Sequence, residues 1–183
     1  MRQPIASPPP WRIRPAGPDD VDALALIGAA TFLESFAGNL DGAALLVHCR
    51  NQHAAAAYAA YLAKGAQAWL VEVEPGHAPV GYALLTSPEL DAARDGDIEL
   101  KRIYLLSRFH GMGMAQALMD TVQQAAAHDH IRLLLGVKDD NHRALSFYRR
   151  QGFARIGDRQ FNVGGLIYQD LVLACPLTLP AAS

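Results

Sequence analysis

The chain has 183 residues, of which 51% are hydrophobic and 19% charged, and its formal net charge is −2. This length and composition predict one globular domain that can bury a core without disulfides or metals. A near-neutral charge gives no broad attraction to nucleic acid or acidic membranes, so neither is an expected partner. Cys49 and Cys175 are too few for a disulfide framework, which favours a reducing, cytoplasmic location.

The N-terminal third of the sequence predicts a leader followed by alternating strand and helix. Residues 1–10 contain a proline run without the apolar core of a signal peptide, so we expect a disordered leader there and a single domain over residues 11–183. A first strand is expected at Trp11–Arg14. Asp19 or Asp20 then caps an amphipathic helix.

Further elements follow from composition and turn signals. The alanine-rich stretch Ala54–Ala63 predicts a helix. Trp69–Glu74 and Val80–Thr86 have strand composition and flank the turn sequence PGHAP, so they predict a hairpin. Near the C-terminus we expect a short strand at Phe153–Ile156, a turn at Gly157-Asp158 and a final strand at Leu166–Leu173.

The most informative stretch runs from Ile98 to Met119. An apolar run passes into a glycine-rich turn that opens a segment with helical spacing, which predicts strand, loop and helix. Gly111 and Gly113 allow a tight bend beside the unpaired N–H groups of a helix N-terminus, so the turn predicts an anion site, most simply for phosphates. Gln116 breaks a dinucleotide fingerprint, and the Gly-Lys-Ser/Thr triplet of a P-loop does not occur.

The strand that enters this turn changes its alternation. Ile98 and Leu100 share one parity, whereas Ile103 and Leu105 share the other, with Lys101-Arg102 at the change. A slip of one residue within a strand is typical of a β-bulge.

A second motif follows about thirty residues later, after an apolar strand at residues 131–137. It has the form N-x-x-A-x-x-F-Y-x-x-x-G-F and comprises Asn141, Ala144, Phe147, Tyr148, Gly152 and Phe153. Together the two motifs resemble the GCN5-related N-acetyltransferase (GNAT) superfamily over roughly residues 11–173. The resemblance implies an α/β (α+β) fold in which helices flank a mixed, mostly antiparallel central sheet with one splayed parallel pair.

The resemblance also implies acetyl-CoA as co-substrate, with its pyrophosphate on the glycine turn and its pantetheine arm along the bulged strand. The implied cofactor-binding residues are Ile103, Tyr104, Leu105, His110, Gly111, Met112, Gly113, Met114, Ala115, Asn141, Ala144 and Tyr148. His110 departs from the Arg or Gln usual in the family. Since a protonated imidazole adds charge, we expect coenzyme A affinity to rise modestly below about pH 6.5. Asn141 has a second interpretation as a helix N-cap.

Direct transfer to an amine requires a proton acceptor and a proton donor for the leaving thiolate. Tyr148 occupies the family's tyrosine position and is the candidate general acid. Glu99 is the candidate base, directly or through water, with Glu34 as second choice. Glu99 can equally pair with Lys101 on its own strand. The spacings of the seven histidines match no metal motif, so we expect no metal.

The acceptor is expected to be a small-molecule amine, with Glu34, Phe36 and Asp41 as candidate substrate-binding residues in the family's acceptor wall. The segments RIY, TF-x-E-x-F and Asp170-Leu171 resemble, more weakly, the bacterial polyamine N-acetyltransferases, which favours an acceptor such as spermidine. Another amine acceptor (an amino acid, an aminoglycoside or a protein N-terminus) and a non-catalytic acyl-CoA sensor remain alternatives. Homodimers are frequent in the family, but no stretch identifies an interface.

Overall fold

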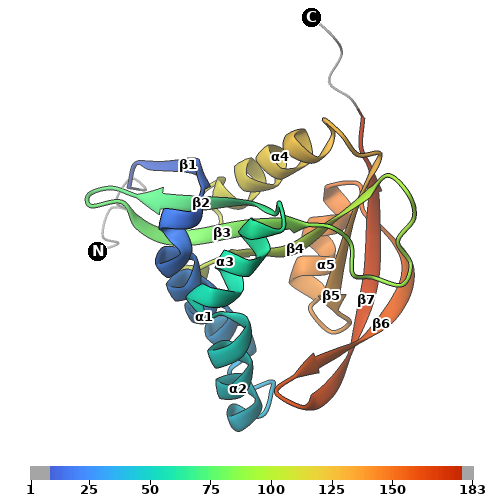
Figure 1. Ribbon diagram of the computed structural model, residues 1–183, viewed down its shortest axis with the longest axis horizontal. Helices are drawn as coiled ribbons and strands as arrows, with labels where there is room; N and C mark the ends of the chain where they lie inside the picture. The colour runs from blue at the N-terminus through green and yellow to red at the C-terminus, as the bar shows by residue number, and fades with distance from the viewer. Residues whose placement is uncertain (1–8, 179–183) are drawn as a thin grey trace, which may run out of the picture.

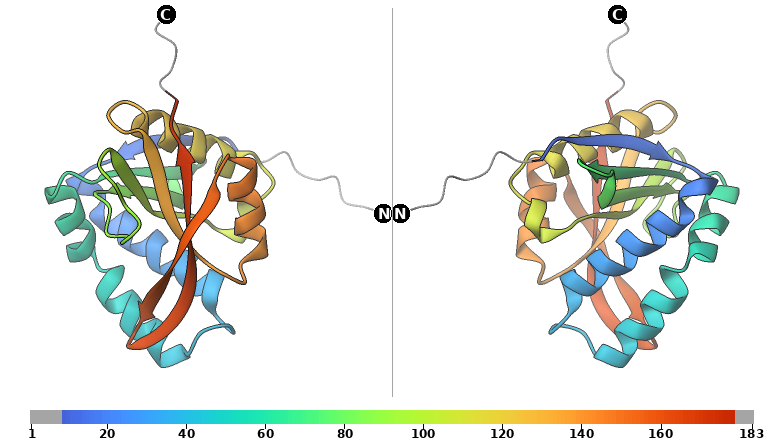
Figure 2. Two further views of the ribbon diagram at one scale, coloured as in Figure 1. Left: turned by 90° about the vertical axis from the view of Figure 1, so that its right-hand side faces the viewer. Right: turned by 90° about the vertical axis from the view of Figure 1, so that its left-hand side faces the viewer.

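The computed structural model describes residues 9–178, which form one seven-stranded sheet with helices on both faces (Figures 1 and 2). The strand order is β1-β2-β3-β4-β5-β7-β6, and every neighbouring pair is antiparallel except β4 with β5. The strands are β1 (Trp11–Ala16), β2 (Gln67–Val73), β3 (Ala78–Thr86), β4 (Asp97–Leu105), β5 (Arg132–Lys138), β6 (Ala154–Val163) and β7 (Leu166–Pro176). The expected mixed sheet with one parallel pair is confirmed.

Two groups of helices cover opposite faces of the sheet. The α-helices are α1 (Val21–Phe36), α2 (Gly42–Gln52), α3 (Ala55–Ala63), α4 (Met114–Ala126) and α5 (His142–Arg150), and short 3-10 helices lie at Pro18–Asp20 and Ser107–Phe109. On one face α4 and α5 bury Met114, Leu118 and Tyr148 against the sheet. On the other, α1 and α3 bury Leu24 and Tyr58 against β2 and β3. None of the helices in residues 9–178 is long and apolar enough to cross a bilayer.

Strand β4 contributes to both faces because its side chains alternate. Ile98 and Leu100 join the core under α4, whereas Glu99 and Arg102 are buried polar residues of the same strand. The register with β3 shifts between Leu84, which faces Arg102, and Leu85, which faces Leu100, so Lys101 is the extra residue of a bulge. The expected β-bulge is therefore present in the structure.

The parallel pair separates immediately beyond this bulge. Strand β5 pairs with β4 only from Arg132 to Leu134, the last pair being Glu99 with Leu134, yet β5 continues to Lys138 along β7. From Lys101 onward one edge of β4 has no strand partner among residues 9–178. The two strands thus form a splayed cleft that opens toward their C-terminal ends.

A buried ion pair holds the closed end of this cleft. Arg132 donates from Nε and Nη2 to the two carboxylate oxygens of Asp97 at 2.9 and 2.6 Å. These hydrogen bonds from Arg132 lower the pKa of Asp97, whose side chain is 1% exposed. Because Asp97 and Arg132 face each other in the ladder, the pair stabilises the parallel register just before the strands part.

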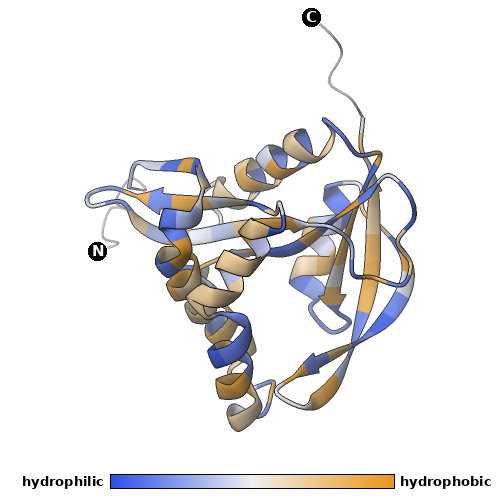
Figure 3. Ribbon diagram, in the orientation of Figure 1, coloured by the Kyte–Doolittle hydropathy of each residue, from blue (hydrophilic) through white to orange (hydrophobic). Residues whose placement is uncertain are grey.

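The C-terminal hairpin corrects one sequence prediction. The turn expected at Gly157-Asp158 is wrong, because β6 continues through both residues and bends only at a register shift between Arg155 and Gly157. The continuous partner β7, whose middle is strongly hydrophobic in Figure 3, pairs with both Gly157 and Asp158, and Ile156 is the extra residue of a bulge. The hairpin of β2 and β3 agrees with the sequence prediction. The predicted leader lies outside the described residues except for its last two.

Candidate active site

The N-terminus of α4 is open to an anion. Gly111 and Gly113 adopt φ values of 81° and 82°, and a Cβ at either position would meet nothing within 4 Å. Gly113 is the N-cap and provides no side-chain hydrogen bond, whereas α2 and α5 are capped by Asp41 and Asn141. The first N–H groups of α4, beginning at Met114, therefore remain available, and the helix dipole makes this end positive. Such an end fits a pyrophosphate.

His110 ties this turn to the end of β4. Its Nε2–H donates to the carbonyl oxygen of Leu105 at 2.8 Å, and its Nδ1 is buried without a hydrogen-bond partner among residues 9–178. The ring is thus turned toward the strand. The expected rise of coenzyme A affinity at low pH stays a prediction.

Tyr148 lies in α5 with its ring in the core. It is 9% exposed and packs edge-on against Phe147 and Phe153, with ring centroids 5.6 and 5.7 Å away. Burial raises the pKa of the Tyr148 phenol well above its ordinary value, and Tyr104 adds to the rise. Burial also raises the pKa of Tyr104, to about 12. Both phenols therefore keep their protons at physiological pH, as a hydrogen-bond donor or general acid requires.

Glu99 is held between charged neighbours at the last β4–β5 pair. The side chain of this 1% exposed residue accepts a 2.8 Å hydrogen bond from the Glu89 N–H. Lys101 Nζ lies 3.8 Å from Glu99 Oε1, and Arg159 Nη1 lies 4.0 Å from the same atom. The candidate base thus has the Lys101 neighbour that the alternative interpretation expected, and a second cation that the sequence did not indicate.

A groove of about 740 Å³ reaches this charged cluster through Lys101 and Arg159. Its walls come from the C-terminal half of α2, from α3, from the loop after β3, from β4 and from the β6–β7 hairpin. The lining residues are His48, Gln52, Tyr61, Glu89, Leu90, Asp91, Lys101, Asp158, Arg159, Gln160, Phe161, Asn162 and Gln169. Both signs of charge are present in this groove, which we call the acceptor groove after the role proposed for it below.

Comparison with known proteins identifies the family of this chain. Residues 31–153 match the family model described as the acetyltransferase (GNAT) family. The chain belongs to this family. It is 34% identical over 155 residues to an uncharacterized N-acetyltransferase of Mycobacterium bovis, which covers 84% of this chain and 96% of the relative. An N-acetyltransferase of Mycobacterium tuberculosis, also uncharacterized, matches with the same identity and coverage.

Solved structures share the fold at low sequence identity. The PaiA N-acetyltransferase of Thermoplasma acidophilum in complex with coenzyme A superposes with a TM-score of 0.72 at 14% identity, covering 91% of this chain and 99% of that one. A putative acetyltransferase of Salmonella typhimurium with its cofactor acetyl-CoA gives 0.66 at 19% identity, covering 95% and 98%. The GNAT fold and membership of an N-acetyltransferase family are therefore confirmed.

The predicted substrate residues of this GNAT protein lie outside the acceptor groove. Glu34 accepts hydrogen bonds from the N–H and the hydroxyl of Ser107, each at 2.8 Å, and so ties α1 to the loop after β4. Asp41 caps α2 by accepting from the Ala44 N–H at 2.9 Å. Phe36 packs on Phe32. None of the three is among the residues that line the groove.

Asn141 shows the helix-capping geometry that was its second interpretation. Its side-chain oxygen accepts from the Ala144 N–H at 3.1 Å. This bond fixes the start of α5, the helix that carries Tyr148. A role toward the cofactor stays a prediction.

A buried polar cluster supports the groove wall. Arg102 is 8% exposed, donates from Nη2 to the Gln52 carbonyl at 2.8 Å, and lies 5.0 and 5.5 Å from the ring centroids of Tyr58 and Tyr61. Burial, with Arg102 as the next cause, lowers the pKa of His48 to about 4 and that of His53 to about 2. Both histidines are therefore neutral at physiological pH.

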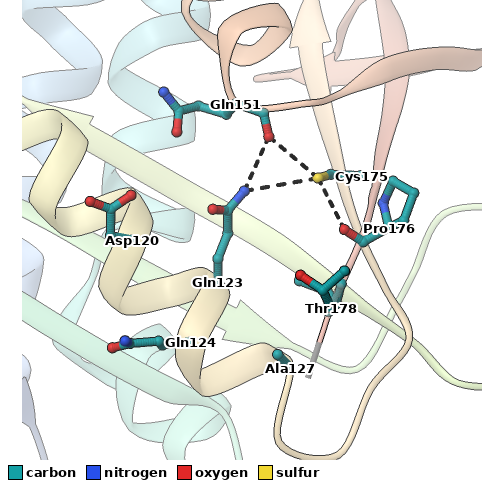
Figure 4. A pocket seen from close by; sticks show the side chains of 9 residues that line it. Asp120, Gln123, Gln124, Ala127, Gln151, Cys175, Pro176 and Thr178 are labelled. Carbon is teal, nitrogen blue, oxygen red and sulfur yellow. Dashed lines mark hydrogen bonds between the residues drawn. The ribbon is translucent and has the colours of Figure 1, made fainter. Parts of the chain in front are cut away.

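A second hollow, of about 380 Å³, lies at the C-terminal ends of α4 and β7 (Figure 4). Cys175 Sγ lies 3.4 Å from the Gln151 carbonyl and 3.3 Å from that of Pro176, and Gln123 also reaches Gln151. Burial raises the pKa of the Cys175 thiol, which makes a reactive thiolate unfavourable. Among residues 9–178, no cluster of three His, Cys, Asp or Glu side chains could hold a metal ion.

Arg159 is the groove residue that sequence reasoning missed. The residues around Arg159 have the pattern of an exposed strand and match no functional motif. A signal did exist in Gly136, because a glycine inside an apolar strand often marks the close approach of another group. A Cβ on Gly136 would lie 2.3 Å from the guanidinium of Arg159.

Proposed function

We propose that this GNAT protein transfers an acetyl group from acetyl-CoA to a primary amine, by direct attack within the splayed cleft. The observation that carries the proposal is the separation of β4 from β5 beyond Glu99 and Leu134, next to the uncapped N-terminus of α4. One feature offers an unpaired strand edge and the other offers free N–H groups and a positive dipole. The two match the pantetheine and pyrophosphate parts of one ligand.

The cofactor would be held mainly by backbone groups. The free edge of β4 at Ile103, Tyr104 and Leu105 would pair with the pantetheine amides as an added strand does. The pyrophosphate would lie on the turn and first helical residues, namely His110, Gly111, Met112, Gly113, Met114 and Ala115. Asn141 and Ala144 at the start of α5 would border the arm. The two solved structures described above with coenzyme A or acetyl-CoA support this assignment through their shared fold.

The reaction would proceed in one transfer step. The neutral amine nitrogen attacks the thioester carbonyl carbon, the C–S bond breaks, and the acetyl group becomes an amide. The acceptor ammonium first loses one proton, and after the attack its nitrogen loses a second one. Both protons pass to Glu99 in turn, directly or through water, and then to solvent. Tyr148 donates its phenolic proton to the departing thiolate and recovers one from solvent, so the products are the acetamide, coenzyme A and one proton.

The acceptor is proposed to be a small amine that enters by the acceptor groove. A polyamine such as spermidine is the class that the weaker sequence resemblance favours, and Glu89 and Asp91 in the groove could bind a cation. Glu34 and Asp41, which also suggested a polycation, are engaged in local hydrogen bonds. The cytoplasmic location and the oligomeric state stay predictions.

Thiol release from acetyl-CoA tests the proposal. The full-length protein is assayed with spermidine, spermine, amino acids, aminoglycosides and short peptides, in wild type and in Tyr148→Phe. We expect amine-dependent release, with kcat in Tyr148→Phe lower by about a hundredfold or more, the scale of general acid catalysis. Tyr168→Phe in β7 is the control. If the protein binds acetyl-CoA tightly but no amine causes thiol release, the proposed acetyl transfer is wrong and the sensor alternative is supported.

A further inference from the structure

The acceptor groove presents two cations beside the candidate base. Lys101, the extra residue of the β4 bulge, lies 3.8 Å from Glu99, and Arg159 from β6 lies 4.0 Å from the same oxygen. Lys101 also pairs with Glu89. An acceptor that approaches the splayed cleft through the groove therefore meets two cations beside Glu99, each of them already paired with a carboxylate.

Arg159 is held in one position by buried groups. Its Nε and Nη2 donate to Asp170 Oδ2 at 3.1 and 3.0 Å, and Asp170 is 5% exposed. The guanidinium lies against Gly136 of β5, where any Cβ would come within 2.3 Å, and 4.9 Å from the ring centroid of Phe161. A guanidinium fixed on three sides is preorganised for a ligand, since little rotamer freedom is left to lose on binding.

Part of this guanidinium is accessible from the groove. Asp170 occupies Nε and one N–H of Nη2. Within residues 9–178 Nη1 makes no hydrogen bond, and it lies 4.0 Å from Glu99 Oε1. The side chain is 25% exposed and lines the groove. The Nη1 and Nη2 N–H groups that remain form a fork of the kind that binds a carboxylate with two parallel hydrogen bonds.

The charge pattern of the groove favours an acceptor that carries both a positive and a negative group. Asp91 suits an ammonium, and the remaining N–H groups of Arg159 suit an anion, whereas Lys101 is paired with Glu89 and Asp158 with Arg155. A polycation would place an ammonium beside Arg159, and a polyanion would meet the three carboxylates. A molecule with one amine and one anionic group can satisfy both sets.

We infer that the acceptor is a primary amine that also carries an anionic group, a carboxylate in the simplest case, and that Arg159 binds this group. The inference rests on the proposed function, and it narrows the small-amine acceptor to amino-acid-like amines in place of the polyamine that the weaker sequence resemblance favours. Arg159 is then the residue that determines specificity. Gly136 and Asp170 act through it as positioning residues.

The test compares amines that differ only by a carboxylate. Lysine is paired with cadaverine, ornithine with putrescine and tyrosine with tyramine, and spermidine is added. We expect kcat/KM to be at least about tenfold higher for the carboxylate-bearing member of each pair, mainly through KM, as a charge-assisted bidentate contact provides. In Arg159→Gln, the ratio of kcat/KM between the carboxylate-bearing amine and its decarboxylated partner should approach one.

Two further variants separate recognition from folding. Because Arg159→Gln leaves Asp170 buried and unpaired, the double variant with Asp170→Asn is measured beside it and should lose the same preference. Arg155→Gln, on the same strand and paired with the exposed Asp158, should keep it. Equal or better use of the decarboxylated amines by wild type, or a preference that survives in both Arg159 variants, would overturn the inference.

Calorimetric titration of the same amines into the protein loaded with coenzyme A distinguishes this inference from the proposed function. If no amine is acetylated, the proposed function fails, and binding alone decides the inference. Binding of the carboxylate-bearing amines that is lost in Arg159→Gln would support it. Failure of every such amine to bind would overturn it.

Discussion

The splayed cleft proposed for the cofactor and the acceptor groove both lie near Glu99, which ends the β4–β5 pairing and neighbours the groove residues Lys101 and Arg159, yet they are built in different ways. The cleft consists of backbone features within one continuous stretch, the β4 edge and the glycine turn before α4, together with the departing strand β5. The groove consists of side chains from α2, α3, β4, β6, β7 and the loop after β3. The first depends on register and on φ angles, and the second depends on which distant side chains meet.

The cleft and the groove also differ in the source of their charge. The cleft provides unpaired N–H groups and a helix dipole, which no single side-chain substitution removes. The groove provides ion pairs, Arg159 with Asp170 and Lys101 with Glu89, whose partners come from different elements. Substitutions should therefore affect one half of the site without the other, and four experiments examine that separation.

The largest effect is expected from Gly136→Ala. The new Cβ would overlap the Arg159 guanidinium, 2.3 Å away, and the flexible arginine would move off Asp170. We expect kcat/KM for the acceptor to fall by about thirtyfold, the scale of one charge-assisted contact. The dissociation constant of acetyl-CoA should stay unchanged. Gly157→Ala, where a Cβ meets nothing within 4 Å, is the control. A weaker affinity for acetyl-CoA would contradict the separation.

Gly113→Ala should affect the opposite half. Alanine at a φ of 82° costs about 1 kcal/mol of unfolding free energy, and its methyl group would enter the phosphate site. We expect the dissociation constant of acetyl-CoA, measured by calorimetry, to rise by about tenfold as the backbone cradle is obstructed. Gly65→Ala, at a φ of 86° in the turn before β2, carries the same strain away from the cleft. If Gly65→Ala loses as much affinity for acetyl-CoA as Gly113→Ala does, backbone strain and not obstruction of the phosphate site explains the loss.

Acid should destabilise the groove wall through its buried histidines. Burial lowers the pKa of His48 to about 4, below the value of about 6.5 expected in the unfolded chain. The unfolded state therefore takes up protons first, and the free energy of unfolding falls as pH drops from about 6.5 toward 4.

His48→Phe should remove part of this acid sensitivity while keeping the stacking on Phe32. Between pH 7.5 and pH 5.5, the loss of unfolding free energy measured with urea should be smaller in the variant by about 1 kcal/mol. Equal losses in the two proteins would show that His48 is not held neutral in the fold. His53 keeps its own contribution in both, since its pKa is also lowered.

The smallest effect is expected at the cap of α5. Asn141→Ala removes the hydrogen bond that the Asn141 side chain accepts from the Ala144 N–H, and should cost about 1 kcal/mol of unfolding free energy. Asn141→Asp keeps an acceptor for that N–H and should cost less. If acetyl-CoA affinity falls in both variants while only the alanine variant is destabilised, Asn141 also contacts the cofactor. Unchanged affinity in both would limit it to capping.

The sequence could predict the cleft because its determinants are local. Gly111 and Gly113 mark the turn, and the change of parity around Lys101 marks the bulge. The turn expected at Gly157-Asp158 failed because pairing with β7 overrode a local signal. The local hydrogen bonds of Glu34 and Asp41 could not be predicted from the sequence, because they depend on how α1 and α2 pack. A substrate contact by either residue stays a prediction.

Hydrogen exchange of the full-length protein, with and without acetyl-CoA, tests the central claim most directly. We predict that acetyl-CoA slows exchange at Ile103–Leu105 and Gly113–Gln116, the unpaired edge of β4 and the uncapped end of α4, and leaves the β6–β7 hairpin unchanged. Protection confined to the hairpin or to α2 and α3, with none at the β4 edge, would contradict a backbone-built cofactor cleft.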